Sequence, residues 1–179
     1  MGDATRREAG EVIFTAKLRE FKTLGAVLGY RYVSDIIVPD GTDAPPRHSM
    51  LYRPSAHPGC VAPHLWLKDG SSLYDHFGKG YTLLATKNNE IDQIRRAEET
   101  ATGLGVPMKV IQPQDLRLPY RYQATFALIR PDQHVAWRGN SIPRDFASII
   151  AQVSGTLSQD RVIAGTTASS CPISGAAPD

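Results

Sequence analysis

Hydrophobic positions recur at helical spacing near the start of the chain, between about residues 6 and 28. The apolar stripe consists of Ala9, Ile13, Ala16, Leu24 and Leu28, widened by Val12 and Phe21. Gly25 and Gly29 indicate where this helix frays and ends. The pattern therefore predicts an N-terminal helix within residues 1–30.

Residues 31–62 are expected to form a strand and a connector. An aromatic and β-branched run, YRYVSDIIVPDG, closes with Pro-Asp-Gly, which favours a strand followed by a turn. The prolines that recur from Thr42 to Pro63 remove backbone donors. This segment should cross a surface as a loop that connects elements and adds nothing to the core.

Short apolar runs dominate residues 63–155. They predict a short strand at 65–67, a helical turn capped by Ser71 or Ser72, and buried strands at 81–86 and 106–111. Between the two buried strands lies a helical stripe that Asn88 or Asn89 can cap, formed by Ile91, Ile94, Ala97, Ala101 and Leu104.

A connector (residues 112–121) is followed by two further strands, at 122–130 and 134–138. The last helix is expected to be capped by Ser141, with a stripe of Phe146, Ile149, Ile150 and Val153. The Ser-, Thr-, Ala-, Gly- and Pro-rich residues 156–179 are expected to be a flexible tail.

This order of elements predicts an α/β fold with a thioredoxin-like mixed sheet flanked by helices, preceded by the N-terminal helix and the proline-rich loop. Two strands joined by a helix pair in parallel, and the hairpin adds antiparallel strands. The usual middle helix is expected to be only a loop. Lys87 to Glu90 occupy the positions of a redox Cys-x-x-Cys, so the residues exclude disulfide chemistry.

Composition indicates one globular domain with a packed core, since 41% of the 179 residues are hydrophobic and 21% are charged. The net charge of +2 and the scattered arginines argue against a nucleic-acid partner. The chain has no long apolar run, and its charged N-terminus is unlike a signal peptide, so we expect a cytoplasmic protein without a membrane partner. Cys60 and Cys171 are expected to be free thiols.

The stretch LIRPDQHVAWRG gathers the first candidate site, namely Arg130, Asp132, His134, Trp137 and Arg138. Pro131 and Asp132 favour a type I turn that leaves Gln133 in the left-handed region. Alternation would put Trp137 on the face of Val135, opposite His134 and Arg138. In the favoured interpretation Trp137 is core and the charged groups finish the strand ends; the alternative is a ligand clamp of Arg130, His134 and Arg138.

A second candidate cluster consists of His64, Trp66, Tyr74 and Asp75, with His76 beside them. A His-Asp pair supports general-base chemistry if Ser71 or Ser72 lies within reach, whereas a structural histidine is the commoner arrangement. The histidines lack metal-ligand spacing, so no metal site is expected. Gly78-Lys79-Gly80 leads into a strand, unlike a phosphate-binding loop, and is expected to be a turn.

Three motifs together carry a family resemblance: LGYRYVSDIIVPDGT, YRPSAHPGCVAPHLWLKDGSSLYDHFGKGYTLL and FALIRPDQHVAWRG. Over about residues 15–153 the chain resembles the thioredoxin-like C-terminal region of FAD-dependent aromatic-ring hydroxylases. These are group A flavin monooxygenases, including hydroxyphenylpropionate and polyketide hydroxylases. Two positions depart from the family pattern, with Val61 in place of an arginine and Gln133 in place of a glycine.

The resemblance implies an accessory or dimerisation domain that is not catalytic alone. Its partner would be an FAD-binding module in the same or a separate chain, with a homodimer as a further expectation. FAD and NAD(P)H are implied for the whole enzyme, but the GxGxxG unit that binds FAD does not occur here. The N-terminal helix would be a remnant of packing against that module and would expose an apolar patch if the chain is alone.

Two alternatives remain open. The chain could be a stand-alone, flavin-independent enzyme of aromatic or polyketide metabolism that uses the hairpin and the His64 cluster. It could also be a small-ligand binding protein of the same metabolism.

Overall fold

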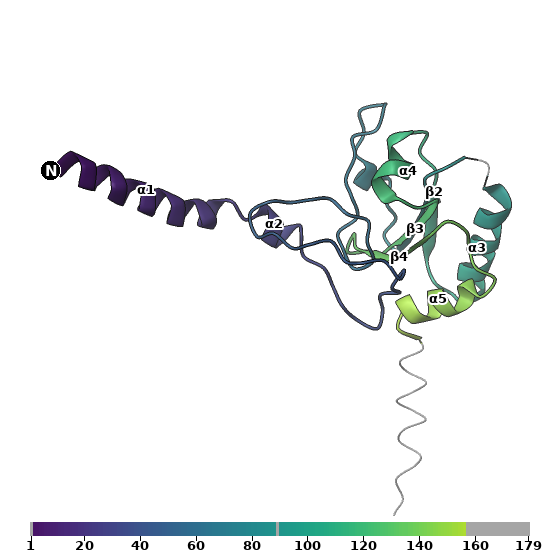
Figure 1. The fold of residues 1–179 in the computed structure, drawn as a ribbon. Helices are drawn as coiled ribbons and strands as arrows, with labels where there is room; N and C mark the ends of the chain where they lie inside the picture. Colours follow the sequence, from purple (N-terminus) through teal and green to yellow (C-terminus); the bar gives the residue numbers. More distant parts are fainter. Residues whose placement is uncertain (1, 89, 157–179) are drawn as a thin grey trace, which may run out of the picture.

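The computed structural model describes residues 2–88 and 90–156, and its centre is a four-stranded mixed sheet (Figure 1). The strands are β1 (Tyr81–Ala85), β2 (Met108–Ile111), β3 (Phe126–Ile129) and β4 (Val135–Gly139), in the order β2-β1-β3-β4. β1 pairs in parallel with β2, whereas β3 is antiparallel to both β1 and β4. The predicted mixed α/β fold with a thioredoxin-like strand order is confirmed.

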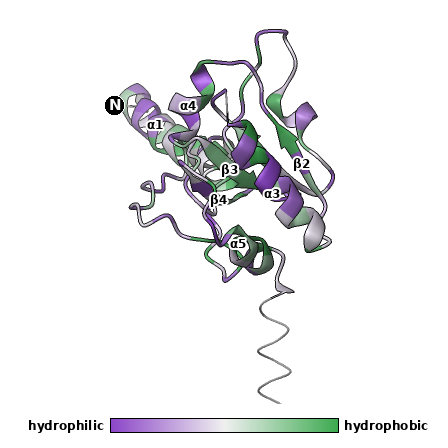
Figure 2. Ribbon diagram, turned by 90° about the vertical axis from the view of Figure 1, so that its right-hand side faces the viewer, coloured by the Kyte–Doolittle hydropathy of each residue, from purple (hydrophilic) through white to green (hydrophobic). Residues whose placement is uncertain are grey.

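Helices α3 (Ile91–Gly103) and α5 (Phe146–Val153) cover one face of the sheet. Successive residues of β1 alternate between the two cores: Leu83 packs with this helix layer and Leu84 with the opposite one. Figure 2 shows hydrophobic residues concentrated on the strands and hydrophilic residues along much of α3. The predicted apolar stripe of α5 packs as expected, with Phe146, Ile150 and Val153 buried.

The opposite face is covered by an additional short helix, α4 (Arg117–Tyr122), where the sequence predicted only a connector. Leu118 and Tyr122 are buried, and the Tyr122 hydroxyl donates to the carbonyl of Pro63 at 2.9 Å. Pro119 lies in the first turn, where its missing N–H breaks no helical hydrogen bond. The proline argued against a helix in the sequence, although at this position it is compatible with one.

Two predicted helix caps are wrong. The residues that precede α3 and α5 are Glu90 and Asp145, and neither makes a side-chain capping bond. The Asn88 amide instead donates to Gln114 Oε1 at 2.6 Å, and Asn89 lies outside the described residues. Ser141 is too early to cap α5, which begins at Phe146.

Residues 30–62 contain no regular strand, contrary to the prediction for 30–41, and run along β4 through single bridges. Tyr32 N–H donates to the Gly59 carbonyl, and Gly59 N–H donates to the Val135 carbonyl, at 2.8 and 2.7 Å. Gly59 has φ +90°, and a Cβ there would lie 2.2 Å from the Tyr32 oxygen. Ala56 and Ala62 belong to the core, so the expectation that the connector adds nothing to it is also wrong.

The short strand predicted at 65–67 is reduced to one bridge, between Trp66 and Ser72. The predicted helical turn is present as the 3₁₀ helix η1 (Leu73–His76). Ser72 caps it and forms a capping box with Asp75, which confirms the expected cap.

A β-bulge in β4 changes the expected faces of the hairpin. Ile129 pairs with Val135 and Leu128 with Trp137, so Ala136 is an extra residue on β4. Both Ala136 and Trp137 therefore pack toward the helix layer, whereas Val135 packs into the opposite core. The prediction that Val135 and Trp137 share a face is wrong.

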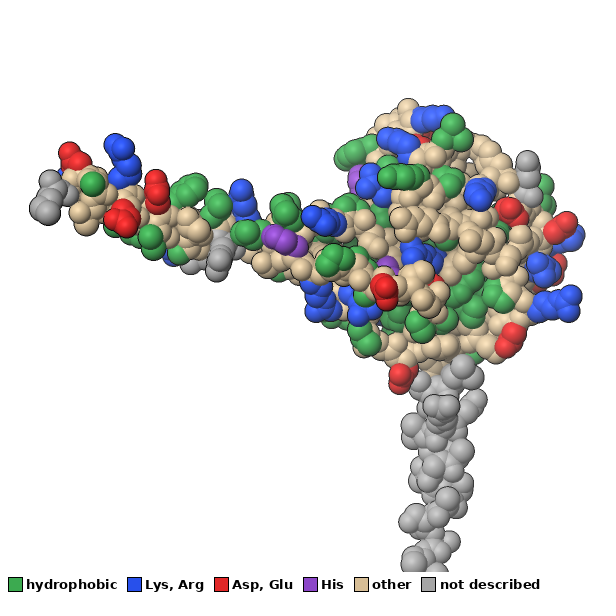
Figure 3. Space-filling view, in the orientation of Figure 1, with side chains coloured by type: hydrophobic (Ala, Val, Ile, Leu, Met, Phe, Trp, Pro, Cys, Tyr) green, Lys and Arg blue, Asp and Glu red, His purple; other side chains and the backbone are tan. Residues whose placement is uncertain are grey.

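The N-terminal helix projects from the sheet domain as an arm (Figure 1). It is broken into α1 (Gly2–Phe21) and α2 (Leu24–Val27), whereas the sequence predicted one helix that continues to Leu28. Val12, Ile13 and Phe14 are 66%, 62% and 66% exposed, as expected for a chain alone, but three consecutive residues point to different sides of the helix. The apolar side chains described in the arm therefore do not form a single stripe, and Figure 3 shows charged side chains among them.

Among the described helices, none combines the length and the apolar character needed to cross a membrane. The predicted flexible tail, apart from Thr156, and Cys171 lie outside the described residues.

Candidate functional site

The hairpin turn between β3 and β4 contains a set of polar contacts centred on Asp132. Its carboxylate accepts from Arg130 Nε and Nη2 at 3.1 and 2.8 Å, and from the His134 N–H at 3.2 Å. Burial alone would raise the pKa of Asp132, but these hydrogen bonds and the Arg130 charge lower it. Gln133 has φ 66°, the left-handed conformation expected for this turn. Arg130 and Asp132 therefore neutralise each other.

The His134 ring lies against two tyrosines of residues 30–32. Its centroid is 4.6 Å from that of Tyr32 and 6.3 Å from that of Tyr30, both edge to face. Nδ1 lies 3.0 Å from the Asp132 carbonyl, an acceptor, so this nitrogen carries the proton. The Arg130 guanidinium also lies over Tyr32, 5.9 Å from the ring centroid. Arg130 and His134 thus hold residues 30–32 against the sheet.

Arg138 is directed to other partners. Its Nε donates to Asp40 Oδ2 at 2.5 Å, Nη1 to the Tyr122 carbonyl at 3.2 Å, and Nη2 to Thr42 Oγ1 at 3.2 Å. Its guanidinium is therefore engaged within the protein. Of the hypothesised ligand clamp, Arg130 and His134 lie together in the structure, whereas Arg138 is separated from them. Trp137 lies in the core, as favoured, with its ring 5.6 Å from that of Phe146.

Sequence reasoning missed the partly buried network around Asp40. This carboxylate accepts from Thr42 N–H at 2.9 Å and from the Thr42 hydroxyl at 2.6 Å, besides Arg138. Burial would raise its pKa, but the hydrogen bonds and the Arg138 charge lower it to about 2. The buried His57 ring lies 3.9 Å away through Nε2. The Asp-Gly-Thr turn signalled the Thr42 bonds, but nothing local could signal Arg138.

The structure brings three members of the second candidate cluster, His64, Trp66 and Tyr74, into contact. His64 Nε2 lies 2.9 Å from Ser72 Oγ, and the His64 ring packs edge to face on Trp66 and Tyr74, at 5.1 and 5.0 Å. The Tyr74 hydroxyl donates to the Ala62 carbonyl, and burial raises the pKa of Tyr74 to about 12. Asp75 contacts Ser72 N–H as part of the capping box, so it does not serve as a partner for His64.

Neither serine has a complete hydrolytic arrangement. Ser71 Oγ donates to Asp69 at 2.6 Å, so its bond to His76 Nε2, at 2.8 Å, must be one that it accepts. Ser72 is free to donate to His64, but the nearby backbone N–H groups are occupied. Leu73 N–H donates to Leu65, Tyr74 N–H to the Ser72 hydroxyl and Asp75 N–H to the Ser72 carbonyl. No donor pair of this turn is left to stabilise an oxyanion.

The turn between β1 and α3 does not suit the phosphates of a dinucleotide cofactor. Residues 86–90, which join β1 to α3, contain no glycine, so they cannot form the tight phosphate turn of a dinucleotide site. The described residues also include no group of three His, Cys, Asp or Glu side chains that could hold a metal ion.

Comparison with known proteins places these elements in a family. The family model for the C-terminal part of aromatic-ring hydroxylases matches residues 55–156. The FAD-dependent monooxygenase apdD of Emericella nidulans is 36% identical over 75% of this chain and 23% of its own length. Aklavinone 12-hydroxylase RdmE of Streptomyces purpurascens is 32% identical over 71% of this chain and 26% of its own length.

Comparison with solved structures supports the same family. The rebeccamycin biosynthetic enzyme RebC with reduced flavin matches with a TM-score of 0.73 and 30% identity, covering 86% of this chain and 28% of that chain. This chain spans about a quarter of the length of the relatives that it matches. The protein belongs to the aromatic-ring hydroxylase C-terminal family and is homologous to the C-terminal parts of FAD-dependent monooxygenases.

Proposed function

We propose that this chain serves as the accessory domain of an FAD-dependent aromatic-ring monooxygenase and docks through its arm onto an FAD-binding module in the same or a separate chain. Flavin reduction by NAD(P)H and hydroxylation of the aromatic substrate would take place on that module. Family membership and the span of about a quarter of the relatives' length support this role. So does the lack of a dinucleotide turn between β1 and α3.

The observation that carries the proposal is the exposure of the arm. Helix α1 has 20 residues, and Val12, Ile13 and Phe14 are each more than 60% exposed. Helices in proteins gain most of their stability from tertiary packing, and apolar residues on several sides favour burial against another structure. A partner that encloses the arm would supply the missing contacts.

The test is co-expression with the FAD-binding part of a relative from which its own C-terminal quarter has been removed. We expect a complex on size-exclusion chromatography that is lost with the double substitution Val12→Glu and Phe14→Glu. The matched control is Ile91→Glu, an exposed apolar residue on α3, which should leave the complex intact. A protein that neither binds nor stimulates the module, or a complex indifferent to the arm, would refute the proposal. Self-association through the arm would assign the surface to a homodimer instead.

A second measurement addresses the cofactor. We expect the purified chain, mixed with excess FAD and then desalted, to be colourless, because its residues offer no dinucleotide turn. Stoichiometric retained flavin would contradict the assignment of redox chemistry to another module.

A further inference from the structure

Both ring nitrogens of the buried His57 face carbonyl oxygens. Nδ1 lies 2.9 Å from the carbonyl oxygen of Pro58, and Nε2 lies 3.1 Å from that of Thr42. A carbonyl oxygen can only accept a hydrogen bond, so each of these contacts needs a proton on the histidine nitrogen.

Only the doubly protonated ring of His57 satisfies both contacts. A neutral imidazole has one N–H group and one lone pair, so one of its nitrogens would face a carbonyl oxygen with no proton between them. The hydrogen bonds of the described residues include no donor that could reach that lone pair instead. Since buried polar atoms without a partner are costly, the geometry favours the imidazolium.

A permanent negative charge lies next to this ring. Asp40 Oδ1 is 3.9 Å from His57 Nε2, and the two side chains are both largely buried. Burial would raise the pKa of Asp40, but the hydrogen bonds that it accepts from Thr42 and Arg138 lower it to about 2. The carboxylate is therefore charged at every pH at which a histidine titrates, and it favours the charged ring. Burial of the ring and the nearby charge of Arg138 act in the opposite direction.

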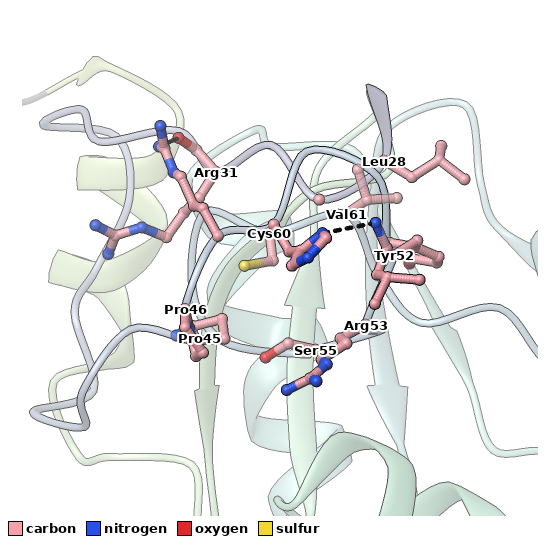
Figure 4. A pocket seen from close by; sticks show the side chains of 13 residues that line it. Leu28, Arg31, Pro45, Pro46, Tyr52, Arg53, Ser55, Cys60 and Val61 are labelled. Carbon is pink, nitrogen blue, oxygen red and sulfur yellow. Dashed lines mark hydrogen bonds between the residues drawn. The ribbon is translucent and has the colours of Figure 1, made fainter. Parts of the chain in front are cut away.

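The other ionisable groups near His57 come from residues 31–35 and from Cys60. Arg31, Tyr32 and Asp35 line a groove together with His57, so a positive and a negative charge are both present there. Cys60 N–H donates to the His57 carbonyl at 3.0 Å, and burial raises the pKa of its thiol, which keeps it neutral. Arg31 and Cys60 also line the small cavity drawn in Figure 4. None of these four groups forms an ion pair with the ring, whereas Asp40 does.

The two bonds of His57 join the ends of the loop formed by residues 42–58. Beyond this loop the chain is fixed to β4, where Gly59 N–H donates to the Val135 carbonyl at 2.7 Å. The middle of the loop packs against α2, since a Cβ on Gly25 would lie 1.8 Å from the His48 carbonyl oxygen. Loss of either ring proton would break one of the two bonds that close the loop at the root of the arm.

We propose that His57 is a pH-sensitive clamp, which as an imidazolium joins Thr42 to Pro58 and on deprotonation loosens the loop of residues 42–58. The folded chain binds the second ring proton, whereas histidines of an unfolded chain release theirs near pH 6.5. The clamp therefore stabilises the fold below about pH 6.5, and this stabilisation is lost as the pH rises further. The clamp is independent of the docking proposed above.

The first test follows the histidine ring protons of the full wild-type chain by ¹H–¹⁵N NMR between pH 5.5 and pH 8.5. The His57 ring is assigned through its own backbone, so no variant is needed. We expect two hydrogen-bonded ring N–H signals at pH 5.5, and loss of one of them in step with amide shifts of the loop residues 43–56. A single ring N–H at pH 5.5, or loop amides that do not follow the ring, would overturn the proposal.

The second test compares unfolding in urea at the same two pH values. Between pH 5.5 and pH 8.5 the unfolding equilibrium constant should rise about tenfold more in the wild type than in His57→Gln, whose side chain carries no charge. An equal rise in the two proteins would refute the clamp. If the glutamine variant does not fold, the ring signals of the wild type decide alone.

The matched control is His48→Gln in the same loop. His48 Nδ1 accepts from the N–H groups of Met50 and Leu51, at 3.2 and 3.0 Å, so these bonds require the neutral ring. The contribution of His48 to stability therefore has the opposite dependence on pH. We expect His48→Gln to show at least the wild-type rise, and a rise reduced as much as in His57→Gln would contradict the assignment to His57.

Discussion

At the scale of single residues, Arg138 connects parts of the chain that lie far apart in sequence. Its guanidinium joins β4 to Asp40 and Thr42 of the proline-rich segment and to the carbonyl of Tyr122 at the end of α4. The side chain is only 9% exposed, and its hydrogen bonds to Asp40 and Tyr122 are partly buried. Its partners give Arg138 a structural role.

We predict that Arg138→Gln lowers the free energy of unfolding by about 2 kcal/mol at pH 7, because it leaves Asp40 without its charged partner. The pKa of Asp40 is lowered to about 2 in the folded protein. The stabilisation is therefore complete above the unfolded pKa of about 3.9 and is lost as the pH falls toward 2. Urea titrations between pH 7 and pH 2 should show the difference from wild type narrowing. An equal difference at both ends would show that the ion pair does not contribute.

Ser72 is likewise explained by structure, since its hydroxyl caps η1 and contacts His64. We predict that Ser72→Ala costs about 1 kcal/mol of stability, while Ser141→Ala, at a serine that caps no helix, changes little. Thermal unfolding measures both. Hydrolysis of an activated ester should be equal in wild type and Ser72→Ala, and a serine-dependent rate would revive the stand-alone enzyme alternative.

At the scale of elements, the β3–β4 hairpin shows how one local irregularity redirects side chains. The extra residue Ala136 brings Trp137 to the helix layer, where its ring packs against Phe146. The turn places Gln133 in the left-handed region, which costs a non-glycine residue about 1 kcal/mol. The backbone of the hairpin is therefore slightly strained, and the contacts of Asp132 stabilise this conformation.

Replacing Gln133 with glycine should raise the free energy of unfolding by about 0.5 kcal/mol, since relief of strain exceeds the added freedom of the unfolded chain. The matched control runs in the opposite direction: Gly105 has φ +66° with open space around it, so Gly105→Ala should destabilise the protein. Denaturant midpoints compare the two. A loss of stability in Gln133→Gly would show that the Gln133 side chain makes a stabilising contribution.

At the scale of the whole molecule, the arm and the sheet domain differ in how they are stabilised. The sheet domain has a core on each face of β1–β4, whereas Val12, Ile13 and Phe14 of the arm are exposed. The arm thus adds little stability to the sheet.

Deletion of residues 2–21 should leave the melting temperature of the sheet domain within about 2 °C of the full chain, because no core contact is removed. Near-ultraviolet circular dichroism of Trp137 and its neighbours monitors that core. A fall of more than about 5 °C would indicate that the arm folds back onto the domain in solution.

The sequence alone determined the elements whose hydrophobic period is clear over their whole length. The runs of β1 and β2, the stripes of α3 and α5, and the Pro-Asp-Gln turn all correspond to observed elements, because period and turn chemistry are local properties. The family motifs likewise predicted the fold and the family that the comparisons confirmed. His64 and Ser72 could be grouped because they lie eight residues apart.

Only the tertiary structure decided the features that depend on partners distant in sequence. The pairing of Arg138 with Asp40, 98 residues away, the bulge at Ala136 and the burial of Ala56 and Ala62 arise when the proline-rich segment packs along β4. The same packing gathers Arg31, Arg47 and Arg53 around one cavity. Period and propensity describe each residue's own neighbourhood, whereas these contacts are selected by the shape and charge of surfaces that exist only after the chain has folded.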